Sequence, residues 1–350
     1  VRVPMLNQTR SKVNAFTSLI RSIFFKIIGM YEIKSRAYSF ARVIIDLPGI
    51  SILYKYFYWK QIKKKNSRLP KTLVVEPYNI CNLECTMCPY PDMTRDKEQM
   101  QLPLFRKIVD DAVENNFESL LFSFYSEPYM DKLLFDKIKY AGQKGLKTTI
   151  TTNGTILTEE MLRKTMECDL DYITFSVDSF DKETYEQIRV NADFHKTLNN
   201  IRKMVEYRNS KNLTKPLITL SAVQHEGDLS LQQMEKILGG LDLYVVSMKD
   251  NRKKNGHQSL SNTSFSSYPC WLPWNHFTIY SDGKVALCCR DFDGAFELGD
   301  MNTQTIKESW DSEKYHDIRN MHLEGKGNQL DLCKDCDLSS RQSPFLWWKL

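Results

Sequence analysis

Residues 72–88 read Thr72-Leu-Val-Val-Glu-Pro-Tyr-Asn-Ile-Cys81-Asn-Leu-Glu-Cys85-Thr-Met-Cys88, an apolar run that predicts a strand, followed by three closely spaced cysteines. Three thiolates on one tight loop hold three irons of a cubane iron–sulfur cluster and leave the fourth iron open. A small chelating molecule that binds the open iron can receive an electron there. Structural zinc is the alternative, but a closed zinc site needs a fourth ligand close by, and none follows Cys88. The spacing therefore favours a cluster.

Length and composition predict a globular protein with one large domain and a smaller one. The chain has 350 residues, of which 42% are hydrophobic, so a packed core is expected. Its nine cysteines gather mostly in two groups, which suits an intracellular iron or zinc protein better than a secreted disulfide scaffold. No signal peptide and no uncharged apolar run of about 18 residues is present. We therefore expect a cytoplasmic location.

The positive charge is concentrated at the N-terminus. Residues 1–72 carry 15 Lys or Arg and two acids, a net charge of +13, so the remaining 278 residues carry about −8 against a total of +5. Nucleic-acid binding by the acidic body is disfavoured. Residues 1–71 form a basic, aromatic-rich extension with helical patterning. It suits peripheral contact with an anionic membrane, docking on the body by its apolar faces, or contact with a phosphate-bearing substrate.

Strand and helix patterns alternate between residues 72 and 248. Strands are expected at 72–78, 118–124, 146–152, 172–177, 216–222 and 243–247, and helices at 103–115, 130–143, 158–168, 194–208 and 230–238. This alternation predicts a parallel sheet, open or curled toward a barrel. Ligands of such sheets bind at the carboxyl ends of the strands. The cysteine loop follows the first strand and therefore lies at that end.

Polar residues follow the next three strands at the same end. Tyr125-Ser126-Glu127-Pro128 comes after the second strand, Asn153-Gly154 after the third, and Ser176 and Asp178 close the fourth. A carboxylate such as Glu127 accepts hydrogen bonds from an ammonium group, and Ser176 and Asp178 suit ribose hydroxyls. Together these strand ends predict a ligand site beside the cysteine loop.

A second cysteine group lies near the C-terminus. Cys270, Cys288, Cys333 and Cys336 form a four-thiolate set, which closes either a structural zinc site or a fully ligated [4Fe-4S] cluster. Residues 277–289 predict a hairpin that turns at Asp282-Gly283. Neighbours on a strand point to opposite faces, so only one of Cys288 and Cys289 is expected to reach the site, and we choose Cys288. Cys168 is expected to be a buried apolar residue.

These motifs resemble the radical S-adenosylmethionine (SAM) superfamily: CxxxCxxC after the first strand, Glu-Pro after the second and Ser-x-Asp after the fourth. The resemblance implies a partial (β/α)6 TIM-like barrel over residues 72–255 and a [4Fe-4S] cluster on Cys81, Cys85 and Cys88. SAM would chelate the open iron, and its reductive cleavage would give a 5′-deoxyadenosyl radical. A flavodoxin- or ferredoxin-type protein would donate the electron. The SAM-binding residues implied are Tyr125, Ser126, Glu127, Asn153, Ser176, Asp178 and Arg189. Tyr125-Ser126 stands where the family usually has Gly-Gly.

The C-terminal cysteines resemble the SPASM/Twitch auxiliary-cluster subclass, and in particular the 2-deoxy-scyllo-inosamine dehydrogenase type. The resemblance implies a small β-hairpin and helix domain over residues 256–350, with a second [4Fe-4S] cluster on Cys270, Cys288, Cys333 and Cys336. Gly283-x4-Cys288, Leu298-Gly299-Asp300 and Ser309-Trp310 also fit this subclass.

The reaction implied is radical oxidation of a carbohydrate- or cyclitol-type metabolite, as in natural product biosynthesis, with the auxiliary cluster as electron acceptor. The alternatives are a maturase that crosslinks or epimerises a ribosomally made peptide, and a sugar epimerase that uses Cys289 as hydrogen donor. A non-catalytic iron–sulfur or zinc module is the remaining reading. His225, Lys249 and Arg252 follow later strands and are candidates to meet a substrate, although surface charge is their default role. The catalytic base stays unassigned.

Overall fold

The structure is a computed structural model, and it describes Ile62 and residues 68–223, 237–238, 244–248, 269–334 and 336. All of these belong to one compact unit, residues 62–341. The predicted helical extension lies outside the described residues except for Ile62, which is helical, and residues 68–71. Within the described ranges, every helix is too short or too polar to span a lipid bilayer.

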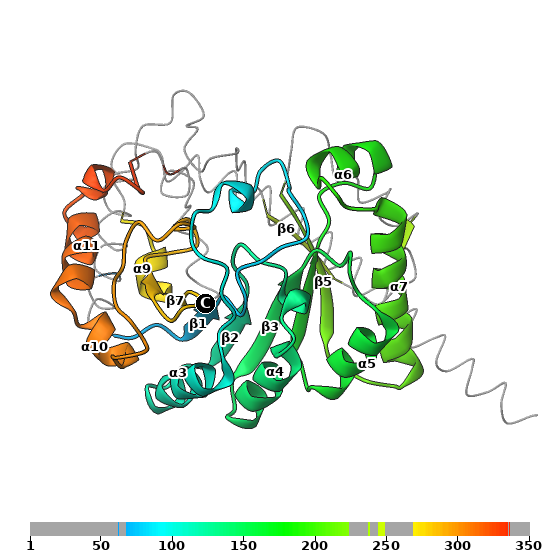
Figure 1. The fold of residues 1–350 in the computed structure, drawn as a ribbon, viewed down its shortest axis with the longest axis horizontal. Helices are drawn as coiled ribbons and strands as arrows, with labels where there is room; N and C mark the ends of the chain where they lie inside the picture. Colours follow the sequence, from blue (N-terminus) through cyan, green and yellow to red (C-terminus); the bar gives the residue numbers. More distant parts are fainter. Residues whose placement is uncertain are drawn as a thin grey trace, which may run out of the picture. The chain divides into compact units, whose positions relative to one another are not determined.

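One open sheet of eight strands forms the centre of this unit, in the order β6-β5-β4-β3-β2-β1-β7-β8 (Figure 1). Neighbouring strands from β6 to β7 run parallel, and only β7 and β8 are antiparallel. The strands are β1 Thr72–Val75, β2 Ser119–Phe122, β3 Lys147–Thr152, β4 Tyr172–Ser176, β5 Leu217–Val223, β6 Tyr244–Met248, β7 His276–Ile279 and β8 Val285–Ala286. The predicted parallel α/β sheet of a partial TIM-like barrel is confirmed.

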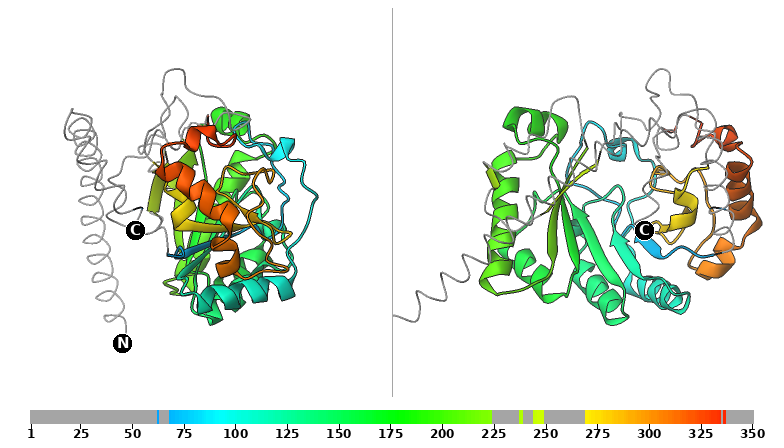
Figure 2. Two further views of the ribbon diagram at one scale, coloured as in Figure 1. Left: turned by 90° about the vertical axis from the view of Figure 1, so that its left-hand side faces the viewer. Right: turned by 180° about the vertical axis from the view of Figure 1, so that it is seen from behind.

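The helices that connect the parallel strands lie on the outer side of the sheet, as Figures 1 and 2 show for α3, α4, α5 and α7. The helices of the unit are α3 Leu102–Glu114, α4 Leu134–Gln143, α5 Glu159–Glu167, α6 Lys182–Ile188, α7 Phe194–Ser210, α9 Leu272–Asn275, α10 Ile306–Trp310 and α11 Glu313–Leu323. Short 3-10 turns occur at Tyr90–Asp92, Pro128–Met130 and Gly327–Gln329. Of the predicted helix 230–238, the structure describes only residues 237 and 238, and both are helical.

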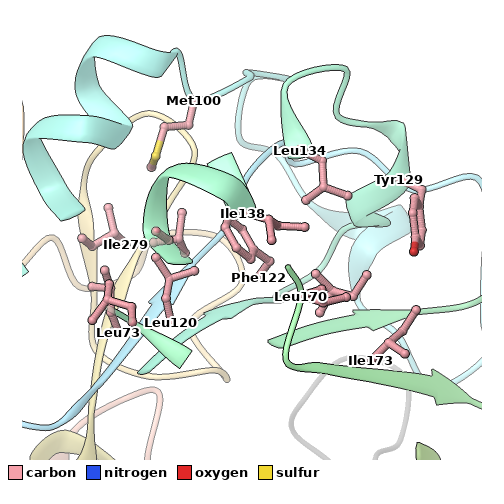
Figure 3. Close-up of a cluster of buried hydrophobic side chains, with 14 of the residues drawn as sticks. Leu73, Met100, Leu120, Phe122, Tyr129, Leu134, Ile138, Leu170, Ile173 and Ile279 are labelled. Carbon is pink, nitrogen blue, oxygen red and sulfur yellow. The ribbon is translucent and has the colours of Figure 1, made fainter. Parts of the chain in front are cut away.

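Alternate residues of the strands form the core under these helices. Strands β2, β3 and β4 bury every second side chain and leave the others half-buried or exposed. Leu73, Leu120 and Phe122 are fully buried and lie with Ile138 of α4 and Ile279 of β7 in one apolar cluster (Figure 3). Most polar strand residues therefore lie on the opposite face, although Thr148 and Thr152 of β3 are buried on the same face as Ile150.

Two boundaries differ from the predictions. The helix expected from residue 130 begins at Leu134, because Asp131 ends the 3-10 turn and its carboxylate accepts the backbone N–H of Leu133 at 2.8 Å. The predicted hairpin does turn at Asp282-Gly283, but its second strand, β8, ends at Ala286, so Cys288 and Cys289 lie on the bend and turn after it and not on a strand as expected. The first strand, β7, also pairs parallel with β1. Phe277 and Ile279 of β7 are fully buried. The C-terminal segment therefore continues the main sheet.

Candidate functional site

The first three cysteines lie on the loop that follows β1, at the carboxyl end of the sheet as predicted. Backbone hydrogen bonds hold this loop against the chain after α6, from Glu84 N to Val190 O (3.2 Å) and from Thr86 N to Ile188 O (2.9 Å). Cys81, Cys85 and Cys88 pack in one small cluster with Leu83 and Ile188. Burial, and to a lesser extent the nearby Glu127 carboxylate and the other two thiols, raise the pKa of Cys81 to about 12. Ligation to iron would have to displace these protons.

Two side chains donate toward the cysteine sulfurs, one from Asn153 after β3 and one from Arg189 at the end of α6. Arg189 Nη1 lies 3.8 Å from Cys85 Sγ, and Asn153 Nδ2 lies 3.8 Å from Cys81 Sγ. Arg189 is itself fixed by an ion pair with the fully buried carboxylate of Asp178, at 2.7 Å from Nε. Donors of this kind orient metal ligands and stabilise negative charge on sulfur. Arg189, Asp178 and Asn153, predicted as SAM contacts, are thus grouped around the cysteine loop.

Glu127 connects the ends of β2 and β3. Its buried carboxylate accepts the hydroxyl of Thr152 (2.7 Å), the backbone N–H of Asn153 (2.7 Å) and that of Tyr129 (3.2 Å). Burial raises the pKa of Glu127 to about 7, although these hydrogen bonds oppose the shift. Part of its role is therefore to fix the strand ends that face the cysteine loop. Its contact with a SAM ammonium group remains a prediction.

Ser126 supplies an unused polar atom at the same place. Its Oγ is buried and has no hydrogen-bond partner among the described residues. Buried hydroxyls are almost always paired, so an orphan at a strand end fits a site that takes a polar ligand group. The donor set and this orphan atom are compatible with SAM beside a cluster.

A row of hydroxyl groups lines the face of the sheet opposite the core. In the parallel register Thr151 of β3 pairs with Thr174 of β4, which pairs with Thr219 of β5. The hydroxyls of Thr174 and Thr219 are 2.8 Å apart. Two residues nearer the carboxyl ends of the strands, Ser176 of β4 pairs with Ser221 of β5. These side chains are only partly buried apart from Ser221, so this face offers polar contacts.

The C-terminal cysteines gather around one pocket. Four thiols line it, together with apolar residues, Arg290 and His322; the thiols are Cys270, Cys288, Cys333 and Cys336. Cys289 is half-buried and is not among the lining residues, and the choice of Cys288 as ligand stays a prediction. Burial holds the pKa of Cys270 and of Cys288 well above the ordinary thiol value.

The described cysteines do not form a ready site for a single metal ion. Among the described residues, no three His, Cys, Asp or Glu side chains are grouped so that they can hold one metal ion. Zinc would bring its sulfurs to about 2.3 Å from a single centre. A cubane cluster spreads its ligands around four irons and suits a wider set.

Two contacts that the sequence analysis missed join the cysteine loop region to the C-terminal segment. The phenol of Tyr125 donates to the carbonyl of Cys289 at 2.7 Å. Arg95 forms a two-pronged pair with the buried Glu76 (2.8 and 2.9 Å), and its Nε donates to the carbonyl of Phe292 at 2.9 Å. The Arg95 guanidinium also lies 4.1 Å from the ring centroid of Tyr280. Glu76 ends an apolar strand, and that acid was the one available sequence signal.

Other predicted residues lie elsewhere. Cys168 is buried in the core, and its Sγ lies 3.3 Å from the carbonyl of Thr165, as expected for a packed residue. His225, Lys249 and Arg252 lie outside the described residues, so their predicted positions at the sheet edge stay untested. His322 was not singled out, but its Nε2 lies 3.7 Å from Cys333 Sγ. Burial lowers the pKa of both His322 and His276 to about 4.

Comparison with known sequences reveals relatives of both parts. A protein of Pyrococcus furiosus described as a tungsten-containing aldehyde ferredoxin oxidoreductase cofactor-modifying protein is 30% identical over 181 residues, and the match spans about half of each chain (51%). The S-adenosyl-L-methionine-dependent 2-deoxy-scyllo-inosamine dehydrogenase of Niallia circulans is 24% identical over 285 residues, which cover 79% of this chain and 96% of that protein.

Solved structures show the same fold at low identity. BtrN in complex with AdoMet and 2-DOIA superposes with a TM-score of 0.54 at 21% identity, covering 77% of this chain and 94% of BtrN. Streptococcus suis SuiB bound to the precursor peptide SuiA gives a TM-score of 0.59 at 15% identity, covering 74% of this chain and 69% of SuiB. The fold thus serves proteins crystallised with a small molecule and with a peptide.

Two family profiles match the two segments of the chain that carry the cysteine groups. Residues 75–221 match the Radical SAM superfamily, and residues 270–337 match SPASM, an iron-sulfur cluster-binding domain. The first match contains the loop of Cys81, Cys85 and Cys88, and the second contains the four thiols of the pocket. These domains account for the predicted cofactors, SAM and two [4Fe-4S] clusters. The chain therefore contains a radical SAM domain, matched over residues 75–221, and a C-terminal SPASM domain, matched over residues 270–337.

Proposed function

We propose that this chain oxidises a polar carbohydrate- or cyclitol-type metabolite by two electrons, converting an alcohol carbon to a ketone. The observation that carries the proposal is the set of four thiols around one pocket, Cys270, Cys288, Cys333 and Cys336. Four ligands leave a cluster no open iron on which a substrate can bind. Electron transfer is the role that remains for such a closed cluster.

When bound, SAM and the first cluster would supply a 5′-deoxyadenosyl radical able to take a hydrogen atom from the substrate, and the second cluster would supply the acceptor for the remaining electron while the proton is lost to a base. In this assignment Cys81, Cys85 and Cys88 hold the first cluster, and Arg189 and Asn153 donate toward its sulfurs. Glu127 keeps the ends of β2 and β3 in place through its three hydrogen bonds. Ser126 offers its unpaired hydroxyl to SAM.

The link between the two sites supports an electron path from substrate to the second cluster. Tyr125 comes from the strand end that meets SAM in this family, and it donates to the backbone of Cys289, next to the proposed ligand Cys288. The hydroxyl row of Thr151, Thr174 and Thr219 supports a polyhydroxylated substrate, because such a face supplies both donors and acceptors. The similarity to the dehydrogenase of Niallia circulans points the same way.

The test is anaerobic reconstitution followed by turnover with dithionite, SAM and a panel of cyclitols and amino sugars. We expect about eight irons per chain and release of 5′-deoxyadenosine. A substrate deuterated at the carbinol carbon should pass its label to 5′-deoxyadenosine while a ketone appears. Intact clusters without any 5′-deoxyadenosine would refute the radical assignment. Redox-neutral product from the same panel would refute the oxidation.

A second candidate is epimerisation or peptide maturation, and one residue favours it. Cys289 is half-buried and does not line the pocket, yet its carbonyl is held by Tyr125. Its thiol is therefore free of the four-cysteine set and near the SAM end of the sheet, where a hydrogen-atom donor would be needed. The fold match to SuiB with its precursor peptide supports a peptide as substrate.

Replacing Cys289 with Ala separates these candidates. If the chain is a dehydrogenase, the Cys289→Ala variant should keep its turnover within about twofold, because the thiol takes no part in the reaction. If the chain is an epimerase that uses this thiol, product should vanish while 5′-deoxyadenosine still forms. Cys168→Ala is the matched control, since that thiol is packed in the core and should leave both reactions intact.

The basic extension, residues 1–71, is proposed to contact anionic membranes at the periphery of a cytoplasmic protein, while a flavodoxin- or ferredoxin-type protein reduces the first cluster. The support for membrane contact is the charge, since 15 Lys or Arg face two acids over residues 1–72. The full chain should float with vesicles that contain phosphatidylserine, and it should be released by high salt. A chain that stays at the bottom of the gradient while the anionic vesicles float would contradict membrane contact.

A further inference from the structure

His322 lies beside one of the four thiols of the pocket. Its side chain is 2% exposed, and its Nε2 is 3.7 Å from the Sγ of Cys333. The other ring nitrogen, Nδ1, is buried and has no hydrogen-bond partner among the described residues. The ring also lines the pocket and meets the edge of Trp274, with 6.3 Å between ring centroids. Cys333 is thus the one polar partner that the described residues offer this imidazole.

The rotation of helix α11 about its axis fixes this position. Ser312 caps the N-terminus of α11. The buried face of the helix consists of Tyr315, Ile318, Arg319, His322 and Leu323. Arg319 secures that face, because its Nη2 donates to the carbonyl of Trp310 (2.8 Å) and its guanidinium lies 3.9 Å from the Trp310 ring. Residues 315, 319 and 322 follow one another at helical spacing. His322 therefore points at the pocket as a consequence of packing along the whole helix.

The sulfur that it meets is held independently. The backbone N–H of Cys333 donates to Leu330 (2.8 Å), and that of Cys336 donates to Cys333 (3.2 Å). The imidazole and the thiol are thus presented to each other by two separately anchored segments. Leu272, Leu287 and Leu332 line the same pocket, so water competes little for the bond.

We propose that His322 is a positioning residue of the second cluster, donating an Nε2–H hydrogen bond to the sulfur of Cys333. The inference rests on the proposed assignment of that cluster to the four thiols. A thiolate ligand carries no proton, so it accepts, and the imidazole must carry its proton on Nε2. Hydrogen bonds to ligand sulfurs stabilise the more negative, reduced cluster and raise its reduction potential. His322 would thereby make this cluster a better electron acceptor.

The test compares His322→Phe and His322→Gln in the full chain. The first cluster is removed by alanine at Cys81, Cys85 and Cys88, so that potentiometric titration followed by EPR reports on the second cluster alone. Phe fills the space but cannot donate, whereas the Gln amide can place an N–H near the position of Nε2. We expect the ratio of reduced to oxidised cluster at fixed potential to fall about tenfold in His322→Phe, which corresponds to about 59 mV for one electron. In His322→Gln, this ratio should stay close to that of the unmodified histidine.

His276→Phe is the matched control in the same domain. This histidine is half-buried and contacts Trp271, with 5.5 Å between ring centroids, but it does not line the pocket. Its replacement should leave the potential unchanged. An unchanged potential in His322→Phe would overturn the proposal, and so would an equal shift in His276→Phe.

A second measurement needs no substitution of His322 and so does not depend on the variants folding. With ¹⁵N incorporated only in histidine, pulsed EPR of the reduced second cluster should show a weak ¹⁵N coupling. Its absence would overturn the hydrogen bond. Loss of the EPR signal itself would overturn the four-thiol cluster and the His322 role with it. Release of 5′-deoxyadenosine by the unmodified chain tests the radical assignment separately, so that assignment could hold even if both of these results were negative.

Discussion

A chain with alanine at Cys81, Cys85 and Cys88 is expected to release no 5′-deoxyadenosine and to hold about four irons instead of about eight. The three thiols share one loop after β1, fixed by backbone bonds to the segment after α6. Removing them removes the open iron that chelates SAM. The second set of thiols lies on other segments of the chain and should assemble its cluster as before. Iron analysis and quantification of 5′-deoxyadenosine under dithionite check both parts.

The matched control replaces the other set, Cys270, Cys288, Cys333 and Cys336, with alanine. This variant should also lose about four irons, yet it should still cleave SAM, because the first cluster does not depend on those thiols. Oxidation of substrate should stop, since the electron has no acceptor. If the first variant still cleaved SAM, or if each variant lost all of its iron, the division of labour between the two sets would be wrong.

Much of the fold follows from local patterns in the chain. Strands in a parallel sheet covered by helices are short apolar runs, and Leu73-Val-Val, Leu120-Leu-Phe and Ile173-Thr-Phe are of this kind. Their ends carry the polar residues that the sheet gathers at one edge. The cysteine spacing and the hairpin turn at Asp282-Gly283 could be predicted for the same reason, because each is encoded within a few neighbouring residues.

The contacts that join the two halves of the site could not be predicted in this way. Tyr125 and Cys289 are 164 residues apart, and Arg95 and Phe292 are 197 apart. No periodicity relates such pairs, because they depend on β7 pairing with β1 rather than on either segment alone. His322 was hidden for the same reason, since a histidine on a helix gives no sign of which sulfur it will face. Sequence reasoning therefore identified the two cysteine groups and the polar residues around the first of them, but not the contacts between the two halves or the position of His322.

The second large effect is expected at Arg95. Arg95→Met should lower the free energy of unfolding by about 3–5 kcal/mol, because it leaves the carboxylate of Glu76 buried without its partner. The Glu76 side chain has no exposed surface, and Arg95 satisfies both of its oxygens at 2.8 and 2.9 Å. Ser281 is the other neighbour, with its N and Oγ each 3.4 Å from Glu76 Oε2. Those two longer contacts cannot replace a guanidinium.

Arg163→Met is the matched control, since Arg163 also grips both oxygens of a glutamate, Glu167, at 2.9 and 2.8 Å. That pair is about half exposed, so its loss should change stability by only about 0–1 kcal/mol. Anaerobic urea unfolding of the cluster-free chain, followed by tryptophan fluorescence, should show a midpoint about 1 M or more lower for Arg95→Met alone. The double variant Glu76→Gln/Arg95→Met should recover part of the loss, because no charge then stays buried without a partner. Equal midpoints for Arg95→Met and Arg163→Met would mean that the Glu76 carboxylate is reached by water, and that the contact of Arg95 with Phe292 does not hold the cysteine loop region to the SPASM domain.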